Sequence, residues 1–279
     1  PSWGGFSCRR RKRRLVMDTP KPILLLSGGP TTRPLWARLS ETYDLLMLYP
    51  QAAEEARGLN IPCAPLAALM EPDLQESVEN TAALLTARVV GALPQVSERF
   101  ARAYGQSAPP ALNGHMGDWF AGYAHHLLLG SVAVLAELDK LGASGRQVVG
   151  CLTHEDVAPD TRAMVAWANA RSLPTIHVPH APCHLLPGVQ DIHRETRARG
   201  IAASGPQMAR FYVESGFPAE HIRLTGAPQW DELYHGAIPS KRESRRVFDL
   251  PDDGRVLMYQ TTWGQTTSLR SDFEREFDQ

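Results

Sequence analysis

Histidines gather in one part of this 279-residue chain, where half of the ten lie between positions 154 and 193. An imidazole titrates near neutral pH and can take a proton from an attacking hydroxyl. His180 comes two residues after an apolar segment that ends at Val178. We therefore predict that His180 is a catalytic general base, and the alternative is a histidine that only hydrogen-bonds loop backbone.

A zinc site is a second interpretation of the same region, because imidazole and thiolate groups are the usual ligands of zinc. The side chains concerned are His177, His180, Cys183 and His184. Pro179 and Pro182 rule out a regular helix here, and the spacing matches no standard zinc pattern. We therefore predict neither a metal nor a cofactor.

Small or polar residues follow other apolar segments in the same way. The residues that we predict to bind substrate are Gly28, Gly29, His154, Glu155, His184, Ser204, Gly205, Thr225, Gly226 and Asp231. In an open parallel sheet such positions gather at the carboxyl edge of the strands, where these folds bind ligands. Each has a structural alternative: a tight turn at Gly28, a helix cap at Ser204, and stabilisation of a helix N-terminus at Asp231.

The elements that must position these residues alternate between strand and helix. Short apolar segments predict strands at 22–29, 45–49, 147–152, 174–178, 201–203 and 222–224, and helices are predicted at 73–90, 118–141, from 160, at 204–216 and from 240. Capping boxes are predicted at Asp73–Glu76, Ser204–Gln207 and Ser240–Glu243, and Asp160 is predicted to cap its helix. The alternation predicts an α/β fold: a Rossmann-like parallel sheet with helices on both faces.

Composition excludes several classes of protein. The hydrophobic fraction of 43% can fill a core, and a net charge of −1 gives no bias toward nucleic acid. Four scattered cysteines favour a reducing compartment, so we expect a cytoplasmic protein. The apolar run at 127–138 is shorter than the roughly 20 residues of a bilayer crossing. The basic run 9–14 could act as a membrane-surface patch at the inner face, or could precede a natural start at Met17.

The organisation along the chain suggests three parts. We predict a basic tail at 1–19, an N-terminal Rossmann-like domain at 20–238, and a linker with the beginning of a second domain at 239–279. The segment 255–259 reads as the first strand of that second domain. A further capping pattern at 271–274 leads us to expect that most of this domain lies beyond Gln279.

Four segments resemble one family when taken together. They are IHVPHA, IAASG, HIRLTGAPQWDEL and VLMYQTTWG, within 147–264. This order resembles the CDP-glycerol glycerophosphotransferase-like and capsule polysaccharide transferases, which have the GT-B fold of two Rossmann-like domains facing a cleft. Thr225, Gly226, Pro228 and Asp231 match the family's Thr-Gly-x-Pro-x-x-Asp segment, and His180 matches its histidine, with Pro179 and Ala181 in place of the usual Gln and Gly.

The resemblance implies a function. The first domain would bind a hydroxyl acceptor, and the second would bind a CDP- or UDP-linked donor. The protein would then move a glycosyl or glycerophosphate group in surface polysaccharide or related glycan synthesis.

Two other interpretations stay open at this point. Non-hydrolysing UDP-N-acetylglucosamine 2-epimerases share the GT-B fold, and their His-Val-Glu-Ala-Gly segment is half matched by His177 and Val178. Such a protein would be an isomerase and would need no acceptor. The third interpretation is a non-enzymatic binding module or an inactive fragment.

Overall fold

The computed structural model describes residues 21–104, 115–179, 196–231 and 239–256. Contacts divide the chain into two compact units, Pro1–Glu232 and Leu233–Gln279. The first contains the sheet and the candidate site. The predicted domain boundaries stay predictions.

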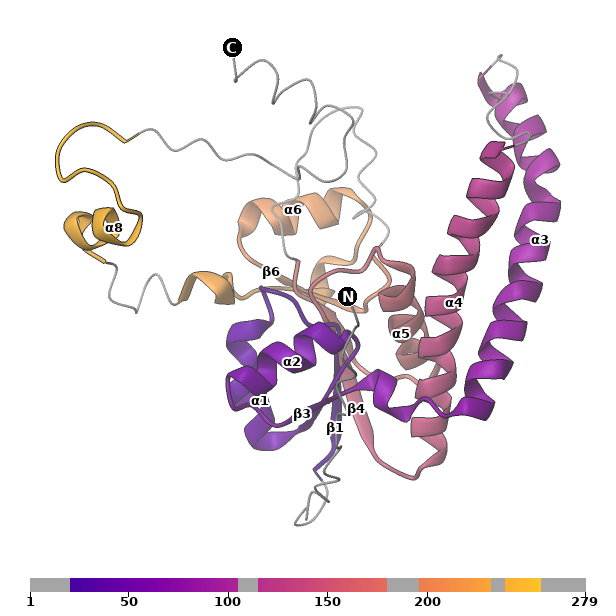
Figure 1. Cartoon of the computed structure of the whole chain (residues 1–279), viewed down its shortest axis with the longest axis horizontal. Coiled ribbons are helices and arrows are strands. Elements are labelled where there is room, and N and C mark those ends of the chain that lie inside the picture. The colour runs from indigo at the N-terminus through magenta and orange to yellow at the C-terminus, as the bar shows by residue number, and fades with distance from the viewer. Residues whose placement is uncertain (1–20, 105–114, 180–195, 232–238, 257–279) are drawn as a thin grey trace, which may run out of the picture. The chain divides into compact units, whose positions relative to one another are not determined.

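The first unit is built on a parallel sheet, in which the described residues form seven strands (Figure 1). The strands are β1 (Ile23–Leu26), β2 (Asp44–Met47), β3 (Cys63–Pro65), β4 (Val148–Thr153), β5 (Thr175–His177), β6 (Gly200–Ala203) and β7 (Ile222–Leu224). Their order is β3-β2-β1-β4-β5-β6-β7, and every neighbouring pair is parallel. The predicted α/β fold is therefore confirmed, as are the six strands predicted between residues 22 and 224.

Strand β1 is the starting point of the sheet, because the chain adds later strands on both of its sides. Ile23 lies opposite Asp44 of β2 on one side and opposite Val148 of β4 on the other. The chain goes first to β2 and β3, and then returns to add β4 and the later strands on the opposite side. The strand order therefore reverses between β1 and β4, which is where folds of this type form a ligand-binding crevice.

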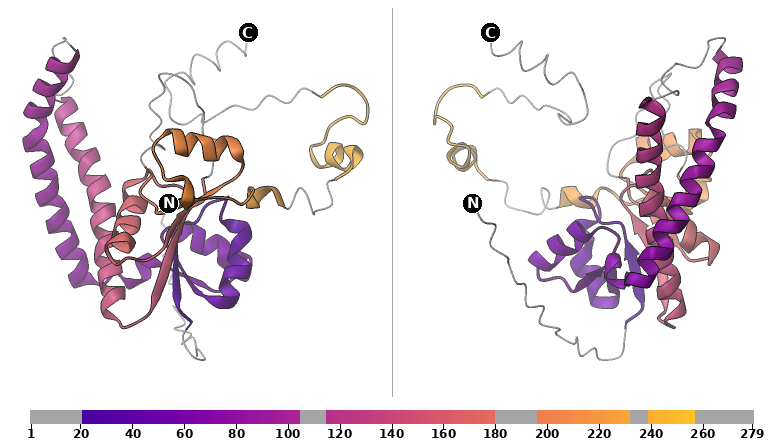
Figure 2. Two further views of the ribbon diagram at one scale, coloured as in Figure 1. Left: turned by 180° about the vertical axis from the view of Figure 1, so that it is seen from behind. Right: turned by 45° about the vertical axis from the view of Figure 1, so that its right-hand side comes forward.

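Helices cover both faces of the sheet (Figure 2). On one face, α1 (Trp36–Thr42) and α2 (Pro50–Gly58) pack on β1 and β2. On the other face, α4 (His115–Ala143) and α5 (Pro159–Ala170) pack on β1, β2 and β4. The strands are almost continuously apolar because both of their faces are buried. Residues of α6 (Pro206–Glu214) form a third cluster with β6 and β7.

A long pair of helices stands beside the sheet. Helix α3 (Pro72–Tyr104) packs along α4, and Thr86 Oγ1 lies 3.2 Å from His125 Nδ1 across the pair. The prediction that this helix ends near Val90 is wrong, since it continues through Pro94. A proline inside a helix costs about 3 kcal/mol, which the packing against α4 outweighs.

The segment Phe120–Ala143 of α4 is long and apolar enough to cross a membrane, by length and composition alone. The run at 127–138, from which no span is predicted, is only the central part of this segment. Part of this helix belongs to the body of the unit, since Val134, Leu138 and Leu141 lie in the core that contains β1 and β4. Its Asp139 also accepts hydrogen bonds from Trp167 and Arg171 on or beside α5.

Several local predictions change in the structure. Strand β3 was not predicted, because it has three residues, ends in a proline and lies at the edge of the sheet. Helix α6 starts at Pro206 with Gly205 as its N-cap, so the predicted Ser204–Gln207 capping box is wrong. Helix α5 has Ala158 as its N-cap, and Asp160 lies in its first turn. Pro206 and Pro159 begin their helices because proline has the helical φ and lacks only an N–H that would stay unpaired.

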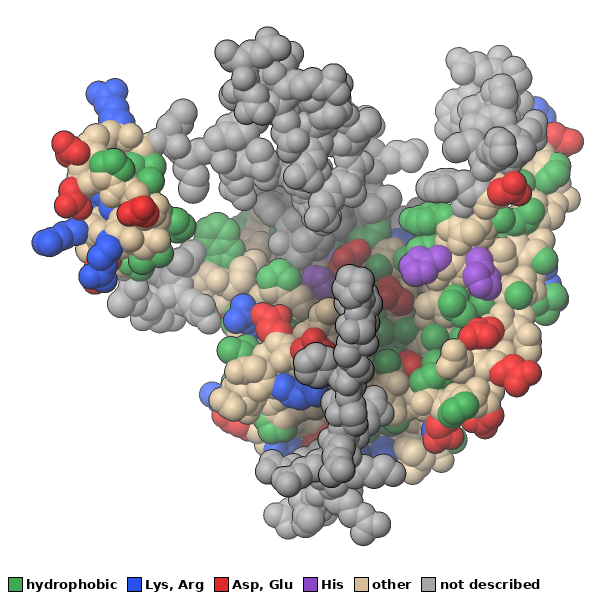
Figure 3. All heavy atoms as spheres, viewed as in Figure 1, with side chains coloured by type: hydrophobic (Ala, Val, Ile, Leu, Met, Phe, Trp, Pro, Cys, Tyr) green, Lys and Arg blue, Asp and Glu red, His purple; other side chains and the backbone are tan. Residues whose placement is uncertain are grey.

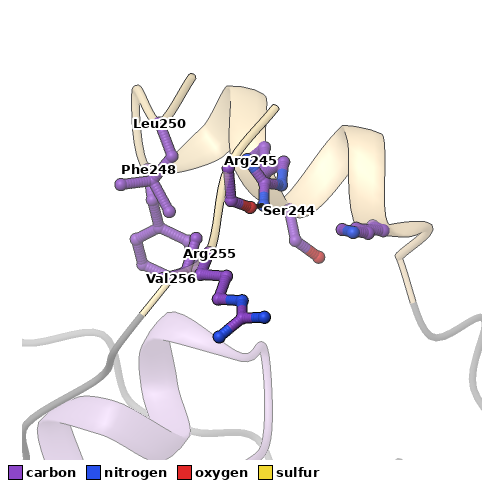
Figure 4. Close-up of a pocket in the computed structure, with 8 residues that line it drawn as sticks. Ser244, Arg245, Phe248, Leu250, Arg255 and Val256 are labelled. Carbon is purple, nitrogen blue, oxygen red and sulfur yellow. Dashed lines mark hydrogen bonds between the residues drawn. The ribbon is translucent and has the colours of Figure 1, made fainter. Parts of the chain in front are cut away.

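In the second unit, α8 (Lys241–Val247) begins with the predicted capping box between Ser240 and Glu243. The buried Arg245 donates to the carbonyl oxygens of Pro251, Asp253 and Gly254, and so fixes the turn that follows the helix. Phe248, Leu250 and Val256 line a pocket around this turn (Figure 4). Arg255 and Val256 are not in a strand, and the rest of the predicted strand 255–259 lies outside the described residues.

Candidate functional site

The carboxyl edge of the sheet brings together the ends of strands that are far apart in the sequence. Ser27, His154, Ser204 and Thr225 directly follow β1, β4, β6 and β7. Because all strands are parallel, these residues lie at one edge of the sheet. The reversal of strand order places the β1 turn beside the β4 loop, and these two segments form the centre of the candidate site.

Ser27 and His154 are in direct contact across this reversal. The Ser27 hydroxyl is fully buried, lies 2.9 Å from His154 Nδ1 and accepts a hydrogen bond from the His154 backbone N–H at 3.0 Å. The Ser27 N–H in turn donates to the carbonyl oxygen of Leu152 at 3.1 Å. The side chain and the backbone of Ser27 therefore both hold the β4 loop against the β1 turn.

The two glycines of the β1 turn are required by close approach and by backbone conformation. Gly28 and Gly29 have φ values of +87° and +95°, which side-chain-bearing residues rarely adopt. A Cβ at Gly28 would lie 2.5 Å from Ala52 Cβ, and a Cβ at Gly29 would lie 2.3 Å from ring atoms of His154. The space beside Gly29 is therefore filled by the imidazole. Direct contact of either glycine with substrate stays a prediction.

Two threonines that the sequence analysis did not single out stiffen this turn. Thr31 Oγ1 donates to the Val178 carbonyl oxygen at 3.0 Å, which ties the turn to the end of β5. Thr32 Oγ1 donates to the Gly28 carbonyl oxygen at 3.0 Å and accepts from Trp36 Nε1 at 3.2 Å. Both threonines are buried, so the β1 turn is a rigid wall of the site. A Thr-Thr pair after a glycine turn is a weak sequence signal, and only the contacts in the structure show that these threonines hold the turn.

Carboxylates follow His154 on the β4 loop. Glu155 is half-buried and Asp156 is buried. Asp156 Oδ2 accepts from Thr196 Oγ1 at 2.6 Å and from the backbone N–H groups of Arg197 and Ala198 at 2.5 and 2.9 Å. Asp156 thus anchors the segment that leads into β6 through Oδ2, whereas its buried Oδ1 has no hydrogen-bond partner among the described residues.

Tyr49 adds a polar group from the end of β2. Its hydroxyl donates to Asp160 Oδ1 at 3.0 Å and lies 3.0 Å from Thr161 Oγ1, in the first turn of α5. Burial, with a further contribution from the charges of Asp160 and Glu155, raises the pKa of the Tyr49 phenol above its ordinary value. Tyr49 therefore stays neutral and holds the start of α5 beside the crevice. Its position at the end of the predicted strand 45–49 is the signal that could have identified it.

Among the described residues, the β4 loop and the first turn of α5 carry the carboxylates Glu155, Asp156 and Asp160. Of the nearby cations, Arg33 pairs with Glu55 at 3.0 Å, and Arg162 Nε donates to the Asp156 carbonyl oxygen of the β4 loop at 3.1 Å. Acidic and histidine side chains are visible in the recess between the sheet and the α3–α4 pair (Figure 3). Carboxylate and imidazole groups suit a ligand with hydroxyl groups better than a polyphosphate, which would require cations.

Only part of the predicted histidine cluster lies within the described residues. His177 is 1% exposed, with Nδ1 3.3 Å from Thr153 Oγ1 and its ring edge-to-face with Tyr212. It is therefore a core residue. His180 and His184 lie outside the described residues, and so does Cys183. Within the ranges that the structure covers, no three His, Cys, Asp or Glu side chains are grouped closely enough to hold a metal ion.

The remaining predicted residues lie farther along the same edge. At about 4.8 Å per strand, Ser204 and Gly205 are about 10 Å from the end of β4, and Thr225 and Gly226 are about 14 Å away. Ser204 is exposed, and its hydroxyl points to Met208 Sδ at 3.6 Å.

After β7 the chain turns back along the edge. Gly226, with φ +79°, allows this turn, and the short helix Pro228–Trp230 then contacts the one at Arg33–Leu35. Asp231 ends this helix and is exposed. The Thr225–Asp231 segment therefore borders the β1 turn despite the strands between them.

Comparisons with known proteins do not place the chain in a family. No family model matches, and no curated protein matches. Among solved structures, the chain is similar to UDP-GlcNAc 2-epimerase from Neisseria meningitidis bound to UDP-GlcNAc, with 12% sequence identity and a TM-score of 0.47. The similar region covers 84% of this chain and 56% of that chain, little more than half of its length. This similarity assigns neither a substrate nor a reaction, so the function has to be inferred from the site itself.

Proposed function

We propose that this protein binds a hydroxyl-bearing acceptor at the β1–β4 crevice and takes part in group transfer to it from a nucleotide-activated donor. The observation that carries the proposal is the position of an imidazole, His154, and of the next residue in the chain, the half-buried carboxylate Glu155, at the reversal of strand order. A hydroxyl both donates and accepts hydrogen bonds, so it can be held by a carboxylate and an imidazole together. The carboxylates that follow β4 favour such an acceptor over the donor's phosphates.

The chemistry of the transfer follows from this arrangement. The acceptor oxygen forms a bond to the transferred group, and the bond from that group to the nucleotide phosphate breaks. The nucleotide leaves with the electron pair, and the hydroxyl proton goes to a base. We assign the base role to His180, as predicted from its position after the β5 segment. The donor, CDP- or UDP-linked, would contribute a glycosyl or glycerophosphate group.

Turnover assays test this proposal. CDP-glycerol and UDP-sugars are offered with and without polyol or oligosaccharide acceptors, and released nucleotide is measured. The expected result is nucleotide release that depends on the acceptor and is lost in His180→Ala. Conversion of UDP-N-acetylglucosamine to its 2-epimer without acceptor would contradict the proposed transferase activity and show that the protein is an isomerase.

A second measurement isolates the crevice. Ligand-observed NMR compares acceptor binding in Glu155→Gln with binding in Glu76→Gln, an exposed glutamate on α3. The proposal expects weaker binding only in Glu155→Gln, by about three- to tenfold, because a charged acceptor of the hydroxyl hydrogen is replaced by a neutral one. Equal acceptor binding in both variants would show that the crevice does not recognise the acceptor.

A further inference from the structure

We infer that the α3–α4 pair binds the surface of a lipid bilayer that contains anionic phospholipids. This inference goes beyond the proposed function and does not rest on it. Its basis is the α3–α4 band, which consists of residues 80–97 of α3 and 119–136 of α4. The band contains no Asp, Glu or Lys, and Arg88 is its one charged residue.

Much of this band is open to solvent. The segment Phe120–Ala143 contains an 18-residue window that is apolar enough for a membrane, yet only 17% of that window is buried inside the protein. A helix of a protein core would be mostly buried. The large apolar side chains of the band with well-exposed surface include Leu84 at 56%, Val89 at 37% and Leu135 at 37%. An added Cβ would meet no atom within 4 Å at Gly91, Gly122 and Gly130.

The length of α4 carries part of the band past the sheet. Helix α4 ends at Ala143, just before β4 starts at Val148, so the two run in opposite directions. Its 29 residues span about 44 Å, whereas the six residues of β4 span about 20 Å. The N-terminal half of α4 therefore extends beyond the carboxyl edge of the sheet, and α3 accompanies it (Figures 1 and 2).

The core contacts of α4 decide that the helix lies on a bilayer and does not cross it. Val134, Leu138 and Leu141 are held in the core that contains β1 and β4. The uncharged stretch that stays outside this core is 119–133, which is shorter than the roughly 20 residues of a bilayer crossing. An apolar helix surface of this kind binds in the interfacial region of a bilayer.

Arg88 selects anionic lipid over a second copy of the chain. It is exposed and forms no ion pair among the described residues. If two copies met through their bands, Arg88 would be desolvated against a surface that has no carboxylate, which is costly. A lipid phosphate supplies the missing anion, and the apolar stem of arginine can lie along the hydrocarbon. Carboxylates gather at the lower end of the pair, outside the band (Figure 3).

The sequence contains a second feature with the same preference. The run at 9–14 consists of six consecutive basic residues, which anionic lipids attract. An apolar surface alone gives marginal, reversible membrane binding, and a polybasic segment together with it gives stable binding. The two features therefore favour the same occupant, an anionic bilayer.

Co-sedimentation of the full chain with vesicles tests the inference. We expect binding to phosphatidylcholine vesicles with roughly 30% phosphatidylglycerol, and much weaker binding to phosphatidylcholine alone. The triple variant Leu84→Gln, Val89→Gln, Leu135→Gln should lower the partition coefficient by about tenfold or more, because less apolar surface leaves water. Arg88→Gln should lower it by about fivefold. The control variant Leu59→Gln, Val213→Gln changes apolar residues that are 45% exposed outside the band, and it should bind like the parent.

Far-UV circular dichroism and urea unfolding check that the triple variant keeps its fold, as expected for substitutions at exposed positions. If it does not, Arg88→Gln decides alone. Unchanged binding in both variants would assign the vesicles to the basic run and overturn the inference. It would also be overturned by an equal loss in the control, by a parent protein that does not bind, or by a dimer that the triple variant disperses without any vesicle binding. Absence of transferase turnover would count against the proposed function alone.

Discussion

The most quantitative prediction concerns Glu137, a carboxyl group in the core of the first unit. Glu137 is 4% exposed and lies on the stretch of α4 that also buries Val134, Leu138 and Leu141. Burial raises the pKa of the Glu137 carboxyl from its ordinary value of 4.5 to about 7. The cause is desolvation of the charged form, which an apolar environment disfavours.

The sign of the effect follows from proton binding. Below pH 4.5 the carboxyl is protonated in both the folded and the unfolded protein, and burial of the neutral group carries no charge penalty. As pH rises from 4.5 to about 7, the unfolded chain loses its proton first, so the free energy of unfolding falls. At 1.36 kcal/mol per pKa unit the full loss is about 3 kcal/mol. Above pH 7 the penalty is constant.

Glu137→Gln removes this penalty because it keeps the shape and lacks the charge. We expect it to stabilise the protein by about 1 to 3 kcal/mol at pH 8 and to have little effect at pH 4.5, measured by urea unfolding across this range. Glu76→Gln, on the exposed surface of α3, is the matched control and should change stability little at either pH. A gain in Glu137→Gln that is the same at both pH values, or no gain at pH 8, would refute the reasoning.

Three further predictions concern the candidate site and are read out by urea unfolding. Gly29→Ala should destabilise the protein by about 2 kcal/mol or more, because the added Cβ would enter the His154 ring and φ is +95°. In the control Gly58→Ala the added Cβ has no atom within 4 Å, so this substitution should be neutral or slightly stabilising. Equal effects of the two substitutions would show that the ring moves freely. Asp156→Ala should cost about 3 kcal/mol or more, since three donors lose their acceptor, and the amides at 197 and 198 should exchange faster with solvent; unchanged exchange would contradict the anchoring role. Tyr49→Phe should cost about 1 to 2 kcal/mol through the loss of its hydroxyl contacts, and a cost near zero would mean that they do not hold α5.

Much of the fold could be predicted because the signals are local. The apolar segment at 147–152 is long enough and its flanks polar enough to identify β4 from composition alone. The same holds for β1, which ends in a Ser-Gly-Gly turn. Strand β3 escaped prediction because its stability comes from pairing with β2 and not from its own three residues. The N-cap of α6 was also predicted wrongly: the helix begins at Pro206, so its N-cap is Gly205 and not Ser204.

The candidate site could be predicted in part. The sequence identified His154 and Glu155 correctly as residues at the carboxyl edge, because the position after a strand is a local property. It predicted Gly29 as a substrate-binding residue, and it connected neither Gly29 nor Ser27 with His154. Tyr49 was predicted only as the end of the strand 45–49, and Asp156 was not predicted to bind substrate, because the contacts that give both residues their roles are long-range.

The sequence by itself determined which segments are strands, that they alternate with helices, and that polar residues follow several of them, because hydrophobic period and turn chemistry act over a few residues. Only the tertiary structure decided the order of the strands. That order sets Ser27 against His154, which is 127 residues away along the chain. Strand order depends on how helices pack on the two faces of the sheet, and this long-range packing leaves no local pattern from which the contact between hydroxyl and imidazole could be read.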